Sequence, residues 1–105
     1  YMGLAQYHMK LGDEAKARQA FAKALRLGPK DALVLNAYAN YLCARGHRTQ
    51  AMTNYAKAIQ YAPPWCLGVV YHNRSLCEQS YGETSQAKAD ESRAKLLMIH
   101  HQVSN

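Results

Sequence analysis

Residues 46–63 read GHRTQAMTNYAKAIQYAP, and they repeat the pattern of residues 12–29, which read GDEAKARQAFAKALRLGP. Seven positions match at a constant offset of 34 residues, as both 46 − 12 and 63 − 29 give. The matched pairs are Gly12/Gly46, Ala17/Ala51, Phe21/Tyr55, Ala24/Ala58, Leu25/Ile59, Leu27/Tyr61 and Pro29/Pro63. A fixed offset of this length indicates a chain built from repeated supersecondary units.

A third, weaker copy follows at a further offset of 36 residues, since 82 − 46 is 36. It keeps Gly82, Ala87, Ala94 and Leu97. We expect the two additional residues to lie in an irregular connection around Pro64-Trp65. This copy has Glu91 in place of the aromatic residue and Lys95 in place of the aliphatic one, and no proline closes it. Such polar drift is typical of a terminal or partly exposed repeat.

Each repeat is predicted to be a helical hairpin. A first helical pattern precedes each glycine, over residues 4–11, 35–44 and 69–79, with apolar residues at three- and four-residue steps. A small residue stands seven positions before each glycine, and small residues allow two helices to pack closely. These small residues are Ala5, Ala39 and Ser75. We expect Asp13 and Thr84 to cap the second helices and Asp31 to cap a first helix.

These helix–turn–helix units of about 34 residues, with A-x3-F/Y, a trailing A-L/I and a closing Pro, resemble tetratricopeptide repeats. The resemblance implies an all-α fold, a right-handed superhelical stack of hairpins. We expect one domain over residues 1–105, with repeats at about 1–31, 32–65 and 66–99 and a tail at 100–105. The chain opens YMGLAQYHMK within a helical pattern, so we expect it to be part of a longer protein.

The formal net charge of +6 admits nucleic acid, an anionic membrane or an acidic protein as a partner. The cations are spread along the segments after each glycine, and no aromatic-flanked basic cluster accompanies them. They are Lys16, Arg18, Lys23, Arg26, Lys57, Lys88, Arg93 and Lys95. This spread favours a solvated helix face over nucleic-acid binding. No apolar run approaches the roughly 20 residues that span a bilayer.

The sequence gives no indication of catalysis. His8, His47, His72, His100 and His101 are scattered, and adjacent histidines on a helix point about 100° apart, which does not suit a shared metal. No nucleophile has a recognisable histidine–carboxylate arrangement, and no phosphate-binding glycine loop is present. We therefore expect no enzyme activity, and no catalytic, cofactor-binding or metal-binding residues.

In a tetratricopeptide stack the first helices line a groove that usually binds segments of other proteins. The residues predicted to line it are Met2, Gln6, Met9, Leu33, Asn36, Asn40, Val69, His72 and Arg74. The alternative for Met2, Met9, Leu33 and Val69 is packing between neighbouring repeats. One branch of the family holds acidic C-termini with lysine and arginine, but Met2 and Val69 stand where the lysines would be. We do not expect that function.

Cys43 and Cys77 lie three and five residues before their glycines, near the same height on neighbouring first helices. Side chains facing each other across such helices can meet the Cα separation of about 5.5 Å that a disulfide requires. This placement favours a disulfide, while buried free cysteines remain the alternative. Cys66, beside Trp65 in the expected connection, has no obvious partner. A disulfide would place the protein in an oxidising compartment.

A second resemblance, to a smaller group of proteins, also favours an oxidising compartment. NAYANYLC at residues 36–43 and YHNRSLC at residues 71–77 resemble the N-x-Y-x-x-F/Y-L-C and Y-x-N-x-G-L-C strings of the type IV pilus biogenesis tetratricopeptide lipoproteins, the PilF/PilW pilotin family. Ser75 stands where that group has glycine. Members are lipid-anchored at the inner face of the bacterial outer membrane and help the pilus secretin to assemble, and some carry a disulfide between these repeats.

Two functional hypotheses follow. The first is a periplasmic, outer-membrane-associated scaffold for type IV pilus biogenesis, which binds a segment of the secretin or another assembly protein and contacts the membrane only through a lipid anchor outside this chain. The second is a cytosolic tetratricopeptide adaptor with free thiols and a different protein partner. A third possibility, an RNA-associated helical repeat, rests on net charge alone.

Overall fold

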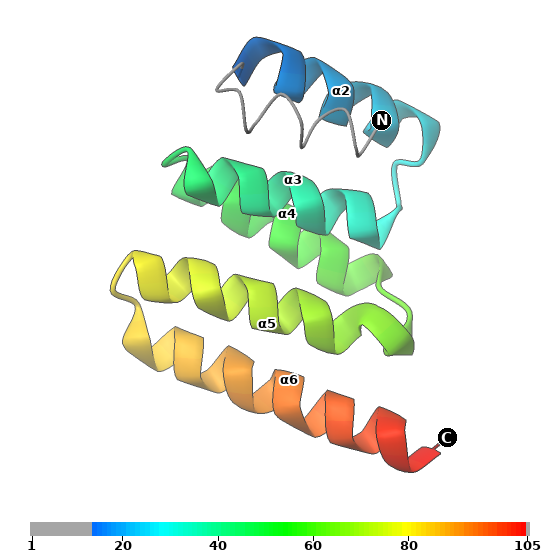
Figure 1. Ribbon diagram of the computed structural model, residues 1–105, viewed down its shortest axis with the longest axis vertical. Coiled ribbons are helices and arrows are strands. Elements are labelled where there is room, and N and C mark those ends of the chain that lie inside the picture. Colours follow the sequence, from blue (N-terminus) through cyan, green and yellow to red (C-terminus); the bar gives the residue numbers. More distant parts are fainter. Residues whose placement is uncertain (1–13, 105) are drawn as a thin grey trace.

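The computed structural model describes residues 14–104, with side chains described as far as Met98. Within that range every regular element is an α-helix: α2 (Glu14–Leu27), α3 (Ala32–Ala44), α4 (Arg48–Tyr61), α5 (Pro64–Ser80) and α6 (Thr84–Ser104). Successive helices run in opposite directions and stack side by side from α2 to α6 (Figure 1). This arrangement confirms the predicted all-α stack of hairpins.

Glycine turns join the two helices of each described hairpin. Gly46, between α3 and α4, has φ of 85°, and Gly82, between α5 and α6, has φ of 76°. Residues with a Cβ atom rarely adopt this left-handed conformation, which explains the glycine at both positions. Residues 4–11, Ala5, Gly12 and Asp13 lie outside the described residues.

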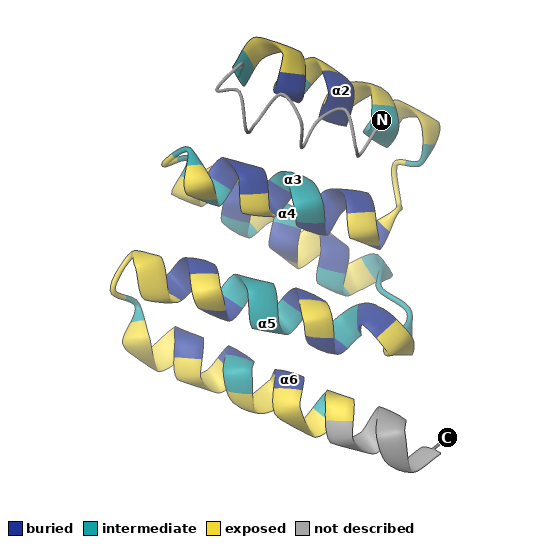
Figure 2. Ribbon diagram, in the orientation of Figure 1, coloured by how far each residue is buried: buried dark blue, intermediate teal, exposed yellow. Residues whose placement is uncertain are grey.

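The core follows the repeated positions. Ala17, Ala51, Ala87, Ala58 and Ala94 are almost fully buried, so small residues occupy the points where helices approach most closely. Phe21 packs against the rings of Tyr38 and Tyr41, with ring centroids 5.1 and 5.5 Å away, and joins α2 to α3. Buried residues occur on every helix from α2 to α6 (Figure 2), and those of α2 to α5 form one core cluster.

Asp31 caps α3 as predicted, because its side chain accepts hydrogen bonds from the backbone N–H groups of Leu33 (3.1 Å) and Val34 (3.3 Å). The predicted cap at Thr84 is wrong, since Thr84 is already the first residue of α6. The preceding residue, Glu83, instead forms an ion pair with Arg48 at the start of α4.

The expectation of an irregular connection around Pro64-Trp65 is also wrong. The helix predicted over residues 69–79 begins at Pro64, and the connection before it contains residues 62–63 alone. Pro64 occupies a first-turn position, where its fixed φ suits a helix and its missing N–H costs nothing. Helix α5 has 17 residues against 13 in α3, so the additional residues lengthen the helix.

Helix α6 continues to Ser104, so residues 100–104, expected as a tail, are helical. Gly68 in α5 packs closely on α6: a Cβ atom placed on Gly68 would lie 3.2 Å from Met98 Cγ and 3.3 Å from the Ala94 carbonyl oxygen. The division into repeats at 1–31, 32–65 and 66–99 stays a prediction.

Candidate functional site: a groove between helices α3 and α5

A groove of about 500 Å³ lies between α3 and α5, and Tyr55 of α4 forms part of its lining. We call it the α3/α5 groove, and its lining residues are Asn40, Cys43, Ala44, Tyr55, Asn73, Leu76, Cys77 and Ser80. None of these described side chains carries a charge at neutral pH. The groove therefore suits an uncharged or apolar ligand surface, with amide and hydroxyl groups available for hydrogen bonds.

Helical spacing brings these residues onto one face. Asn40 and Ala44 are four residues apart on α3, and Asn73, Leu76 and Ser80 follow three- and four-residue steps on α5. On another face of the same helices, the small residues Ala39 and Ser75 are fully buried. The packing of small residues inside the stack thus leaves the adjoining faces of α3 and α5 beside each other at the surface.

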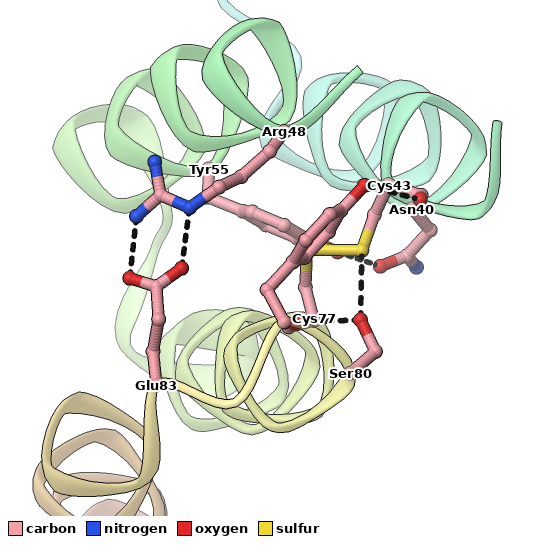
Figure 3. Close-up of a disulfide and its surroundings, with 8 residues drawn as sticks. Asn40, Cys43, Arg48, Tyr55, Cys77, Ser80 and Glu83 are labelled. Atoms are coloured by element: carbon pink, nitrogen blue, oxygen red, sulfur yellow. Dashed lines mark hydrogen bonds and ion pairs between the residues drawn. A yellow bond between two sulfur atoms is a disulfide. The ribbon is translucent and has the colours of Figure 1, made fainter. Parts of the chain in front are cut away.

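The disulfide between Cys43 and Cys77 joins the two helices within the groove (Figure 3). The two Cα atoms are 6.0 Å apart, and the cysteines are 34 residues apart in sequence. The Cys77 side chain is buried and that of Cys43 is half-buried. Ser80 Oγ lies 3.7 Å from the sulfur of Cys43 and donates a hydrogen bond of 2.6 Å to the Cys77 carbonyl oxygen.

Tyr55 fixes the orientation of Asn40. Its hydroxyl group donates a hydrogen bond to the side-chain oxygen of Asn40 (Figure 3). Burial raises the pKa of the Tyr55 hydroxyl, so this group stays protonated and remains the donor at every physiological pH. With its oxygen engaged, Asn40 has its amide N–H groups as the remaining donors for a ligand.

Two contacts near the glycine turns join the two hairpins. Tyr81 donates a hydrogen bond from its hydroxyl to the Cys43 carbonyl oxygen at 3.2 Å. Arg48 forms a bidentate ion pair with Glu83, so the start of α4 is tied to the turn before α6 (Figure 3). Both contacts join the second described hairpin to the first, and they hold α3 and α5 in register.

Of the predicted groove residues, Asn40 lines the groove, whereas Asn36 is 6 % exposed and its side-chain oxygen has no hydrogen-bond partner among the described residues. Val69 and Leu33 are exposed on α5 and α3. Leu33 lines a separate pocket of about 240 Å³ beside Trp65 and Tyr61. Met2, Gln6 and Met9 lie outside the described residues.

The structure places His72 and Arg74 against α6 instead of in the groove. His72 Nδ1 lies 2.8 Å from a carboxylate oxygen of Glu91, and Arg74 donates two hydrogen bonds of 2.7 Å to Asp90. The physical reason is that α6 presents carboxylates at matching heights, and these ion pairs turn both side chains away from α3.

The prediction missed Asn73, Leu76 and Ser80, and the repeat register could have found them. The glycine turns set an offset of 36 between α3 and α5, so Asn40 corresponds to Leu76 and Ala44 to Ser80. The offset of 34 between the first two copies would align Arg74 with Asn40, but the offset between α3 and α5 is 36. Arg74 in fact corresponds to Tyr38, a residue in contact with the core.

The third cysteine is a buried helical residue and not part of an irregular connection. Cys66 is 2 % exposed in the first turns of α5 and is a free thiol in the structure. Burial raises the pKa of this thiol, which disfavours the reactive thiolate. Cys66 therefore behaves as a small apolar core residue.

The family model for the tetratricopeptide repeat matches residues 1–41. Comparisons with curated proteins and with solved structures gave no significant match. The matched segment covers the first repeat and most of α3, and the hairpin stack continues through α6. The match and the all-helical stack support a tetratricopeptide-repeat protein. Such repeats are generally non-catalytic modules that bind other proteins, which indicates an interaction scaffold.

Two further findings concern the described residues alone. No group of three or more His, Cys, Asp or Glu side chains within them could hold a metal ion, and none of their helices is long and apolar enough to cross a bilayer. The cations named in the sequence lie on α2, α4 and α6, and all except Arg18 are exposed.

Proposed function

We propose that the protein is a scaffold that binds an extended, uncharged segment of another protein in the α3/α5 groove. The observation that carries this proposal is the lining itself, in which two asparagines and Ser80 alternate with Leu76 and the disulfide. Asparagine side chains can bond to the backbone of an extended peptide, and Leu76, which is 49 % exposed, offers apolar contact.

The partner chemistry follows from charge. Arg74, the predicted groove residue with a permanent charge, is paired with Asp90, so it is not available to hold an acidic tail. A segment with apolar side chains and free backbone groups fits the lining better than a carboxylate-rich one. Val69 and Trp65 are exposed on the same helix, and they extend the apolar contact surface along α5.

We further propose that the partner is a secretin or another assembly protein of the type IV pilus, and that the protein works in the periplasm at the outer membrane. The resemblance of residues 36–43 and 71–77 to the pilotin strings supports this assignment. Several of the residues that carry the resemblance, including Asn36, Leu42 and Cys77, are buried, so they reflect the packing and the disulfide more than the partner contact.

Peptide selection on the oxidised protein tests the groove. Peptides are selected from a random library, and their affinities are then measured for the parent and for Leu76→Glu, which places a charge in the groove. We expect a loss of affinity of at least tenfold. The matched control is Leu96→Glu, a more exposed leucine (69 %) outside the groove lining, which should bind as the parent does. Equal affinities for the parent and both variants would overturn the proposal.

Two measurements test the compartment and the partner. Thiol titration of the denatured protein without reductant should find one reactive thiol per chain, and three would favour the cytosolic adaptor. Calorimetric titration with a purified type IV pilus secretin should show binding that Leu76→Glu removes. Absence of binding, with selected peptides still bound, would reject the pilus assignment and leave the groove intact.

A further inference from the structure

The α5–α6 hairpin has a polar interior where the α3–α4 hairpin has an apolar one. With the glycine turns aligned at an offset of 36, Leu42 corresponds to Glu78 and Tyr55 to Glu91. Leu42 and Tyr55 are fully buried. Glu78 is 6 % exposed, at the position of the apolar Leu42, and Asp90 on α6 is 2 % exposed, at the position of the polar Asn54. The interior of this hairpin therefore holds two buried carboxyl groups.

Asp90 is fully paired. Arg74 on α5 donates hydrogen bonds of 2.7 Å to each of its oxygens, and Arg93 donates a third at 3.2 Å. Both guanidinium groups also lie over the ring of Tyr71, at 5.3 and 5.7 Å from its centroid. Burial acts to raise the pKa of Asp90, but the hydrogen bonds outweigh it and hold this pKa low. Asp90 is therefore ionised.

Glu78 is in the opposite situation. Its Oε1 has no hydrogen-bond partner among the described residues, although the atom is buried. Burial, and then the neighbouring Asp90, raise the pKa of Glu78 from its ordinary 4.5 to about 7. The charged and titratable groups around it are Arg48 and Tyr55 from α4, Arg74 from its own helix, and Glu83 and Asp90 from the turn before α6 and from α6. Arg93 acts on Asp90.

We propose that Glu78 makes the docking of α6 on α5 proton-dependent: a protonated Glu78 donates a hydrogen bond to Asp90 across the two helices, and an ionised Glu78 loosens α6. Helix α5 stays in place, because the Cys43–Cys77 disulfide ties it to α3. Helix α6 is therefore the element that opens. Its release would expose the polar face of α5 that carries Arg74 and Glu78.

The direction with pH follows from linkage. Between pH 4.5 and about 7 the folded hairpin holds one more proton at Glu78 than the opened one does. Each unit of rising pH therefore favours opening by up to about tenfold, and the effect levels off above about pH 7. The α3–α4 hairpin has Leu42 at the equivalent position and should not respond.

Amide hydrogen exchange of the oxidised protein between pH 5 and 8.5, expressed as protection factors, tests this inference. Protection in α6 should fall by up to about tenfold per pH unit to near pH 7, while protection in α3 and α4 stays constant. Glu78→Gln keeps a hydrogen-bond donor at this site and should abolish the pH dependence. A fall of the same slope in Glu78→Gln, or no fall in the parent, would overturn the proposal.

Two further variants keep the test decisive. His72→Gln removes a titratable partner of Glu91 from another of the polar contacts between α5 and α6, and it should retain the parent's slope. Loss of the slope in His72→Gln would assign the effect to His72 and reject Glu78. If Glu78→Gln does not fold, Glu78→Leu reproduces the residue of the α3–α4 hairpin and should likewise show no slope; a slope in that variant rejects the proposal.

Discussion

The side-chain oxygen of Asn40 on α3 accepts the hydroxyl hydrogen of Tyr55 on α4, and this bond connects the buried interior of a hairpin to the floor of the α3/α5 groove. Tyr55 is fully buried, whereas Asn40 is exposed. A core residue thus orients a side chain that faces the ligand site. The Tyr55–Asn40 hydrogen bond therefore links the stability of the fold to the binding of a ligand in the groove.

Removing the hydroxyl in Tyr55→Phe should lower the free energy of unfolding by about 1 kcal/mol, because one hydrogen bond is lost while Asn40 can still reach water. The same variant should weaken the binding of selected peptides, since Asn40 is no longer held. Urea unfolding and peptide affinity measure the two effects. Tyr38→Phe is the matched control, because Tyr38 packs by its ring against Phe21, and it should change neither.

Reduction of the disulfide should destabilise the protein by about 4 kcal/mol in the chain-entropy model, because the bond closes a loop of 34 residues. Urea unfolding with and without reductant measures the difference. In Cys43→Ser/Cys77→Ser, reductant should have no effect. If the unfolding midpoint of the parent is the same with and without reductant, the disulfide does not form.

Three glycines between helices of the described residues, Gly28, Gly46 and Gly82, should respond differently to alanine. Gly46→Ala and Gly82→Ala should each destabilise the fold by about 1–2 kcal/mol, because both sites have positive φ. Gly28 has no such backbone, and a Cβ there would make an ordinary contact of 3.4 Å with Asp31. Gly28→Ala should therefore be neutral or slightly stabilising. Thermal unfolding of the three variants measures their stabilities. An equal loss of stability in all three would contradict this prediction.

Glu91 should contribute stability that disappears in acid. Hydrogen bonds from His72 and then Ser75 lower the pKa of Glu91 below its ordinary 4.5. The contribution is present above pH 4.5 and is lost as the pH falls through the lower, folded-state pKa. At pH 7, Glu91→Gln should therefore be less stable than the parent, and the difference should shrink towards pH 3. Parallel profiles of urea unfolding against pH would refute this.

The pattern of the repeat was sufficient to predict the hairpins, because glycine turns, small packing residues and the Asp31 cap are local features. The start of α5 was not predictable in the same way. The two additional residues are expected in an irregular connection around Pro64-Trp65, whereas a proline in the first helical turn is well tolerated and α5 begins at Pro64. The residues after Pro64 continue the helix, so Pro64 starts α5 and does not interrupt it.

The groove was predicted only in part. Asn40, a predicted groove residue, lines it, whereas Leu76 and Ser80 were not predicted, although the offset of 36 between Gly46 and Gly82 aligns them with Asn40 and Ala44. The exchange of the aromatic residue for Glu91 is typical of a partly exposed repeat, and Glu91 is half-buried, but the exchange did not indicate the buried carboxyl groups of Glu78 and Asp90. The pairing of Asp90 was not visible either, because Arg74 and Asp90 meet only when two helices pack.

The lengthening of α5 also sets a rule for how this stack can change. The connection before α5 is two residues shorter than residues 28–31, and the helix is four residues longer, which is about one full turn. Growth by a whole turn leaves every later side chain on nearly its original face, whereas two residues inserted mid-helix would rotate those faces by about 200°. The amino-terminal end of α5, which carries Trp65, is thus a position where evolution or design can extend the molecule and leave its neighbours undisturbed.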